Sequence, residues 1–329
     1  MERLPVEVVG NILSKLGGAR DVVIASETCR NRLEILITQT IFQTTGLQGL
    51  SILMDDVDDF SASTVIAWLL YTRETFRRLF YNVRTTPNVN ILDICGRQKL
   101  EILALSHTLF CQYLRTGSRS FAYCMPKIEI LELVNSDIAM SDTQVTVELN
   151  SPTLKCIYVE AISLDKFIIE ADSIECLHLK DCGLDDVSFI HLDIGETVDN
   201  LEIVDVSNFT IFWPKFYQMI SKLSRLRKLR LWDVAFDDEE KIVDLETIAV
   251  CFPQLTIFLW LGWTVINDLF SHWIEGLVER CQNLKKLVIH GIVSEAKSLE
   301  ECQMLANVTS SMVQLMRKYK DVDVQFEYI

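Results

Sequence analysis

Apolar residues recur along this chain in the spacing apolar-x-x-apolar-x-apolar, which places two of every three on one side of an extended segment. The first residues of successive sets lie 20 to 29 residues apart. The sets are Leu47/Leu50/Ile52, Phe76/Leu79/Tyr81, Leu100/Leu103/Leu105, Ile128/Leu131/Leu133, Leu154/Ile157/Val159, Ile174/Leu177/Leu179, Leu201/Val204/Val206, Leu226/Leu229/Leu231, Leu255/Phe258/Trp260 and Leu284/Leu287/Ile289. The spacing predicts short parallel strands stacked over a shared core, with the intervening residues aligned on one exposed face.

A second periodicity, that of amphipathic helices, lies between these sets. In residues 266–281 the apolar side chains recur at intervals of three and four residues, which would place them on one side of a helix. Residues 61–76, 213–223 and 298–319 show a similar pattern. The sequence therefore predicts that each repeat consists of a strand and a helix.

The repeat resembles the cysteine-containing leucine-rich repeat. Its average length of about 26 residues lies within the range of that family, and Cys281 precedes Leu284 as in its pattern, with Cys251 and Cys182 in similar places. The resemblance implies an α/β fold: a leucine-rich-repeat solenoid in the form of a horseshoe, with parallel strands on the concave face and helices outside. We interpret the cysteines as small apolar packing residues and not as metal ligands.

The first residues of the chain do not fit the repeat. Pro5 stands at a first helical position, and an apolar stripe follows at helical spacing before Gly17 and Gly18. Asp21 is a candidate cap for a second short helix that ends at Cys29. We therefore predict an N-terminal all-α segment over residues 1–35, followed by a solenoid of about ten to eleven repeats over residues 36–329.

This N-terminal segment resembles the F-box. The matching positions are Leu4, Pro5, Glu7, Ile12, Leu13, Ser14, Leu16, Asp21, Ala25, Ser26, Cys29 and Arg30. An F-box followed by leucine-rich repeats is similar to the plant F-box/LRR-repeat proteins over essentially the whole chain. The resemblance implies a substrate receptor of an SCF-type cullin-RING ubiquitin ligase, in which the F-box binds a Skp-type adaptor and, through it, the cullin and RING subunits.

The resemblance also implies which residues contact the adaptor. They are Leu4, Pro5, Val9, Ile12, Leu13 and Leu16. The chain departs from the family where Asn31, Arg32 and Leu33 replace the usual Lys-Trp-Arg, so that the third helix is shortened. Two alternatives follow: the first helix only caps the open end of the solenoid, or the chain is a leucine-rich-repeat interaction module or decoy that no longer recruits the ligase.

The outward positions of the predicted strands form the candidate substrate face. We single out Tyr158, His178, Lys180, Lys228, Arg230, Trp232, Lys286 and His290. The later members are mostly basic, which predicts recognition of an acidic segment of a protein substrate or of a small anionic ligand, with Arg230 gripping a carboxylate and Trp232 as an aromatic anchor. The alternative is a solvated face whose charges are paired locally, with Asp205 as a counter-charge.

Composition and charge exclude several other classes. The chain has 329 residues, a net charge of −15 and 49% apolar residues, which argues against disorder and against non-specific binding of nucleic acid or anionic lipid. We expect neither a membrane span nor a secretory leader, and reduced cysteines in the nucleus, the cytoplasm or both. Nucleotide-binding, metalloprotease and hydrolase motifs are absent, so we expect no catalysis and carry over no cofactor.

Overall fold

The computed structural model describes the chain from Asp21 to Tyr328 with gaps. The described residues are 21–25, 30–53, 59–96, 98–106, 109–110, 119–135, 137–138, 145–161, 166–171, 173–180, 191–194, 200–207, 210–211, 223–232, 235–236, 254–262, 274–276, 278–291 and 298–328. They belong to two compact units, Met1–Ala171 and Asp172–Ile329, called here the N-terminal and C-terminal units.

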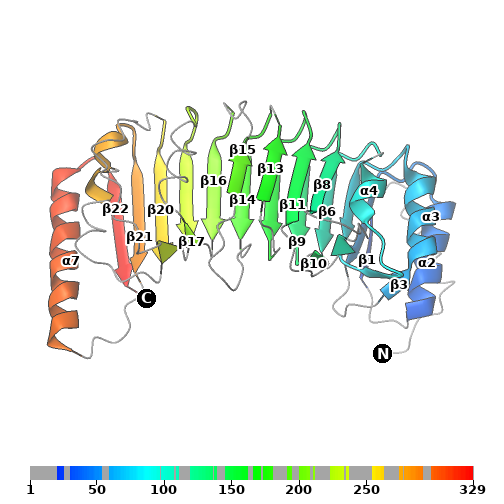
Figure 1. The fold of residues 1–329 in the computed structure, drawn as a ribbon, viewed down its shortest axis with the longest axis horizontal. Helices are drawn as coiled ribbons and strands as arrows, with labels where there is room; N and C mark the ends of the chain where they lie inside the picture. The colour runs from blue at the N-terminus through cyan, green and yellow to red at the C-terminus, as the bar shows by residue number, and fades with distance from the viewer. Residues whose placement is uncertain are drawn as a thin grey trace. The chain divides into compact units, whose positions relative to one another are not determined.

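The N-terminal unit contains a parallel sheet of stacked coils, one strand from each coil (Figure 1). Its strands, in spatial order, are β1 (Asp21–Ala25), β2 (Gly49–Leu53), β4 (Arg78–Tyr81), β6 (Ile102–Ser106), β9 (Ile130–Val134) and β12 (Cys156–Glu160). Spatial order follows chain order, and each paired residue lies opposite the equivalent residue of the next coil. Neighbouring strands are therefore aligned at the same positions of the repeat.

The C-terminal unit is built in the same way. Its strands are β14 (Cys176–Lys180), β16 (Ile203–Ser207), β18 (Lys228–Trp232), β20 (Ile257–Gly262), β21 (Lys286–Gly291) and β22 (Asp323–Tyr328). All neighbouring pairs are parallel. All ten predicted strands are confirmed, and β1 and β22 add strands that the repeat pattern did not include.

The core of each unit consists of the repeat positions. Leu103, Ile157, Leu177 and Leu229 are fully buried, and the strands alternate between buried and partly exposed residues. Burying an aliphatic side chain of this size contributes about 1.5–3 kcal/mol, so the stacked leucines supply most of the driving force for stacking the coils.

Backbone hydrogen bonds repeat from coil to coil just before each strand. The carbonyl of Gln48 accepts bonds from two successive amides of the next coil, Arg77 N at 2.7 Å and Arg78 N at 3.1 Å. The same double acceptance occurs at Arg77, Glu101 and Glu129 in the N-terminal unit and at Glu175, Glu202, Arg227 and Thr256 in the C-terminal unit. Each coil thus fixes the entry point of the next strand, which keeps the outward side chains in register.

Among the described residues, helices accompany only part of the sheet. The N-terminal unit has α2 (Arg30–Gln43), α3 (Ala62–Thr72) and the short α4 (Ile91–Cys95), with the small strands β3 (Asp59–Ser61) and β5 (Arg84–Thr86) paired beside them. Trp68 of α3 is buried, and its Nε1 donates a hydrogen bond of 2.9 Å to Thr38 Oγ1 of α2. The helix predicted within residues 61–76 is confirmed.

Further along this unit, a second parallel sheet replaces the predicted helices. It includes β8 (Arg119–Cys124), β11 (Val145–Asn150) and β13 (Lys166–Glu170), and β7 (Leu109–Phe110) pairs with β10 (Asp137–Ile138). The prediction that every repeat contains a helix is wrong here, because these segments are rich in β-branched and aromatic residues, which favour strands.

The C-terminal unit contains a long helix, α7 (Leu299–Lys318), which precedes β22 and lies beside it (Figure 1). Residues 274–276 and 278–280 are also helical, which confirms the described part of the helix predicted over 266–281. The short strands β15 (His191–Ile194), β17 (Thr210–Ile211) and β19 (Ala235–Phe236) complete the described elements, β17 and β19 being paired. The helix predicted over 213–223 lies almost entirely outside the described residues. No described helix is long and apolar enough to cross a membrane.

The second of the two predicted N-terminal helices differs from the structure over Asp21–Ala25, while the first lies outside the described residues. Asp21–Ala25 form β1, which pairs with β2, so the helix predicted from Asp21 to Cys29 is wrong for these residues. The run Val22-Val23-Ile24 is β-branched throughout, and an adjacent sheet edge offers hydrogen bonds that a short helix lacks. The boundary predicted at residue 35 falls inside α2.

Candidate binding face

The strands position the candidate residues because outward and buried side chains alternate along them. In the N-terminal unit, parallel register places Phe80, Ala104, Glu132 and Tyr158 side by side in one row across β4, β6, β9 and β12. Tyr158 donates its hydroxyl hydrogen bond to Glu160 of the same strand. The tyrosine predicted for substrate contact therefore lies on the outward row with its hydroxyl engaged by a neighbouring carboxylate.

The corresponding row of the C-terminal unit carries His178, Asp205 and Arg230 on β14, β16 and β18. Nη1 of Arg230 donates a hydrogen bond of 3.1 Å to Oδ2 of Asp205. Nδ1 of His178 lies 3.5 Å from the same oxygen. Asp205 thus bridges two of the predicted recognition residues, and we call these three side chains the His-Asp-Arg row.

Electrostatics of this row favour an ionised Asp205. Burial opposes ionisation of its carboxyl group, but the hydrogen bonds from His178 and Arg230 outweigh burial and lower the pKa of Asp205. On β18, burial lowers the pKa of Lys228, and the nearby positive charge of Arg230 lowers it further. Arg230 is thus bonded to Asp205, whereas Lys228 on the same strand senses that carboxylate only through its charge.

A second row of the C-terminal unit carries the remaining lysines. Lys228 on β18 and Lys286 on β21 both lie opposite Ile257 of β20, one on each side. Adjacent strands are about 4.8 Å apart, so the two lysines stand roughly 10 Å from each other with an apolar residue between them. Neither lysine forms an ion pair with a described side chain.

Apolar residues of the same face were missed by the sequence analysis. Ile203, Ile257 and Leu259 are partly exposed at outward positions of β16 and β20. These three residues stand next to buried apolar positions of the repeat, so the sequence already places them on the outward side. The missed signal was the composition of the outward positions of β20. They are apolar, whereas the corresponding positions of β18 are Lys228 and Arg230. The face therefore combines cations with an apolar strip.

A third row lies at the carboxyl ends of the same strands. Register aligns Lys180 with Ser207 and Trp232, and His290 with the end of β20. Lys180 is exposed and His290 partly exposed, whereas the side chain of Trp232 lies outside the described residues. The structure thus places every predicted C-terminal candidate on one sheet, in three adjacent rows.

The predicted adaptor-contact residues, Leu4 to Leu16, lie outside the described residues. The helix that follows them in the chain, α2, exposes Ile35 and Phe42, and its neighbour α3 exposes Leu70 and Tyr71. The rings of Phe42 and Tyr71 meet edge to face, with centroids 4.5 Å apart. We call these four residues the α2–α3 patch.

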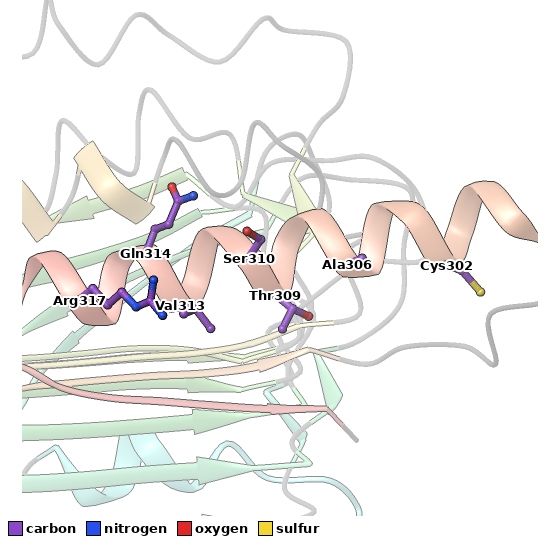
Figure 2. Close-up of a pocket in the computed structure, with 7 residues that line it drawn as sticks. All are labelled: Cys302, Ala306, Thr309, Ser310, Val313, Gln314 and Arg317. Carbon is purple, nitrogen blue, oxygen red and sulfur yellow. The ribbon is translucent and has the colours of Figure 1, made fainter.

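A shallow hollow runs along α7 in the C-terminal unit. Figure 2 shows its lining side chains, which include Cys302, Thr309, Val313 and Arg317 and all come from this one helix. The described residues that line it include no pair of nucleophile and base. Within either unit, the described residues bring together no three histidine, cysteine, aspartate or glutamate side chains close enough to hold a metal ion.

Coils of this length, each contributing one in-register parallel strand with buried leucines and an outward polar row, define a leucine-rich-repeat solenoid protein. An F-box/LRR-repeat protein of Arabidopsis thaliana is 54% identical over 418 aligned residues, with all of both chains covered. The chain belongs to the family of plant F-box/LRR-repeat proteins. The alignment is 89 positions longer than the 329 residues of this chain, so it contains gaps in this chain. No family model and no solved structure matches the chain.

Proposed function

We propose that this protein is the substrate receptor of an SCF-type cullin-RING ubiquitin ligase. The F-box-like segment would bind a Skp-type adaptor, and the outward strand face would hold the protein to be ubiquitylated. The observation that carries the proposal is the relationship to an F-box/LRR-repeat protein along the whole chain. It is supported by a repeat sheet whose outward residues lie in register and are available for recognition.

The composition of the strand face supports an acidic protein segment as the recognised feature. Lys228, Arg230 and Lys286 lie around Ile257 and Leu259, and Asp205 offsets only part of their charge. An extended segment with carboxylates and an apolar side chain would match this arrangement in charge and polarity. A bound segment would exclude water over the apolar strip, and the lower local dielectric constant would strengthen ion pairs formed beside it.

In this proposal the chain contributes proximity and not bond chemistry. Ubiquitin transfer belongs to the other subunits of the ligase, and the receptor raises the effective concentration of the acceptor lysine near them. Cys95, Cys124 and Cys302 are free thiols, which fits our proposal that the protein works in the reducing nucleus or cytoplasm.

A second candidate function is a leucine-rich-repeat interaction module that no longer recruits the ligase. The pairing of Asp21–Ala25 with β2 favours it, because these residues of the F-box-like segment belong to the repeat sheet. In this alternative the strand face binds its partner without delivering it to a ligase.

Co-purification with a plant Skp-type adaptor separates the two functions. We expect the intact protein to form a stoichiometric complex and the Leu13→Asp/Leu16→Asp variant to lose it, with circular dichroism showing that its repeats remain folded. A matched variant with two new carboxylates in the C-terminal unit, Leu299→Asp/Val313→Asp, changes exposed residues of α7 and should bind normally. Absence of a complex with the intact chain would reject the receptor function.

The strand face is tested with a fluorescein-labelled, glutamate-rich peptide. We expect Lys228→Glu/Arg230→Glu to weaken peptide binding by at least about tenfold. Arg225→Glu/Lys285→Glu makes the same change in net charge at exposed residues outside the strands and should leave binding almost unchanged. Equal losses in both variants would show that net charge, and not this face, governs binding.

A further inference from the structure

The outward side of the N-terminal sheet is mainly apolar, whereas that of the C-terminal sheet combines cations with an apolar strip. Two in-register rows form its central part. The first row is Phe80, Ala104, Glu132 and Tyr158, and the row beside it is Arg78, Ile102, Ile130 and Cys156. All of these side chains are partly exposed, and we call them the N-terminal face. Adjacent apolar and aromatic residues that reach solvent are typical of an interaction surface.

Tyr158 lies between two carboxylates. Glu132 stands directly opposite it on β9, and Glu160 follows two residues later on the same side of β12. Neighbouring strands are about 4.8 Å apart, and two residues along a strand span about 6.6 Å, so both acidic side chains flank the tyrosine ring. Glu160 also accepts the hydrogen bond that the Tyr158 hydroxyl donates. The ring therefore has negative charge on two sides.

The charge of Glu132 is not offset within the described part of the unit. Glu132 forms no hydrogen bond or ion pair with a described residue. Arg78, the cation of the N-terminal face, stands two strands away on β4. The nearby Lys155 is paired with Glu129 at 2.8 Å. A carboxylate beside an exposed aromatic ring attracts a cation through its charge and through the ring electrons.

The same row also leaves space for an apolar side chain. Ala104 stands between Phe80 and Glu132, and its side chain is the smallest in the row. We propose that the N-terminal face binds an extended, basic protein segment. An arginine or lysine of this segment lies between Glu132 and Tyr158, and an apolar side chain of the segment lies over Ala104. The inference rests on the proposed function in one respect, which is that the segment belongs to the protein to be ubiquitylated.

Fluorescence anisotropy of a labelled peptide, mixed with the full-length protein in the absence of adaptor, tests this binding. The probe is a short fluorescein-labelled peptide of arginine and leucine, compared with a version that has serine in place of leucine. Glu132→Lys reverses the charge at the face, and Glu132→Gln removes it while keeping the shape of the side chain. Glu170→Lys is the matched control, since it makes the same change in net charge at an exposed residue of β13 in the same unit.

Two variants of Tyr158 separate the ring from the hydroxyl. Tyr158→Leu removes the ring, whereas Tyr158→Phe keeps it and loses only the hydrogen bond to Glu160. Circular dichroism of every variant shows whether the repeats remain folded. We expect Glu132→Lys to weaken peptide binding by at least about tenfold and Glu132→Gln and Tyr158→Leu by at least about threefold. Tyr158→Phe and Glu170→Lys should stay within about twofold of the unaltered protein.

Equal losses in Glu132→Lys and Glu170→Lys would overturn the inference, because net charge and not this face would then govern binding. Unchanged binding in Tyr158→Leu, or equal binding of the leucine and serine peptides, would overturn it as well. If the unaltered protein binds the adaptor but not the peptide, the inference fails and the proposed function stands. If it binds the peptide through Glu132 and Tyr158 but forms no adaptor complex, the face is confirmed and the receptor function is rejected.

Discussion

Arg230 on β18 lies directly opposite Asp205 on β16, and its Nη1 donates a 3.1 Å hydrogen bond to Asp205 Oδ2. The pairing fixes the guanidinium against the sheet, so its remaining donors are presented in one orientation. It also means that the most basic part of the face is partly neutralised. Recognition of an acidic segment then depends on geometry as well as on charge.

Asp205 is expected to stabilise the folded protein in a pH-dependent way. Burial raises the pKa of Asp205, but the hydrogen bonds from His178 and Arg230 lower it by more. The pKa of Asp205 is therefore lowered overall. A carboxyl group with a lowered pKa stabilises the fold above its unfolded pKa, and this contribution is lost as pH falls through the folded pKa. Asp205→Asn should therefore cost about 1–2 kcal/mol at pH 7, and the difference should shrink below about pH 4.

Urea unfolding at micromolar protein concentration measures this difference. Asp323→Asn on β22 is the control, because that carboxylate is exposed and accepts a hydrogen bond only from Gln325 of its own strand among the described contacts. It should change the unfolding free energy by less than about 0.5 kcal/mol. A difference for Asp205→Asn that stays constant from pH 7 to pH 3 would contradict the explanation.

Ala161 is expected to strain the backbone after β12. Its φ is +52°, in the left-handed region, and Asn135 occupies the equivalent position after β9 with a φ of +45°. Alanine pays a steric cost in this region that glycine does not. Ala161→Gly should raise the free energy of unfolding by up to about 1 kcal/mol, whereas Ala104→Gly inside β6 should lower it by about 0.5–1 kcal/mol. Chemical denaturation that shows a loss at both positions would refute the strain.

Ser151 is expected to matter more for stability than the exposed ion pairs. It is fully buried, and its Oγ donates a hydrogen bond of 2.6 Å to the carbonyl of Met125 in the preceding coil. Ser151→Ala should lower the free energy of unfolding by about 1–2 kcal/mol, since the buried carbonyl loses a donor. Lys318 bonds to Glu275 and Glu279 at 2.7 Å each but on the surface, where solvent screens ion pairs, so Lys318→Met should cost less than Ser151→Ala. The reverse order in thermal unfolding would contradict this ranking.

Cysteine reactivity is expected to follow burial. Burial raises the pKa of the Cys95 thiol to about 12, so almost none of it is thiolate at pH 8. Cys124 and Cys302 are exposed. Iodoacetamide at pH 8 should label Cys124 and Cys302 in the folded protein and label Cys95 only after denaturation, as read by peptide mass spectrometry. Rapid labelling of Cys95 in the native protein would show that its coil opens.

Much of the fold follows from local spacing. Each set such as Leu226/Leu229/Leu231 specifies a strand, its buried side and its outward residues, because alternation has a fixed period of two. Equal spacing within the sets also determines register, so that His178, Asp205 and Arg230 could be aligned before any coordinates were known. The candidate adaptor residues, Leu4 to Leu16, stay a prediction.

The return path of each coil was harder to predict. The repeat pattern predicted a helix in each return, whereas segments such as Val145–Asn150 and Lys166–Glu170 form a second sheet because each pairs with a neighbour in the adjacent coil. The strand at Asp21–Ala25 has the same cause, since a short segment takes the structure in which its amides find partners.

The sequence by itself determined the repeat, the side of each strand that is buried, the family resemblance and the identity of the outward cations, because all of these depend on residue type and on short, regular spacing. Only the tertiary structure decided that Arg230 bonds to Asp205, that sheets replace helices behind part of the solenoid, and that Phe42 and Tyr71 meet on an exposed surface. These features depend on which coils are neighbours in space and on which partners remain for a side chain after packing, and neither is encoded within one repeat.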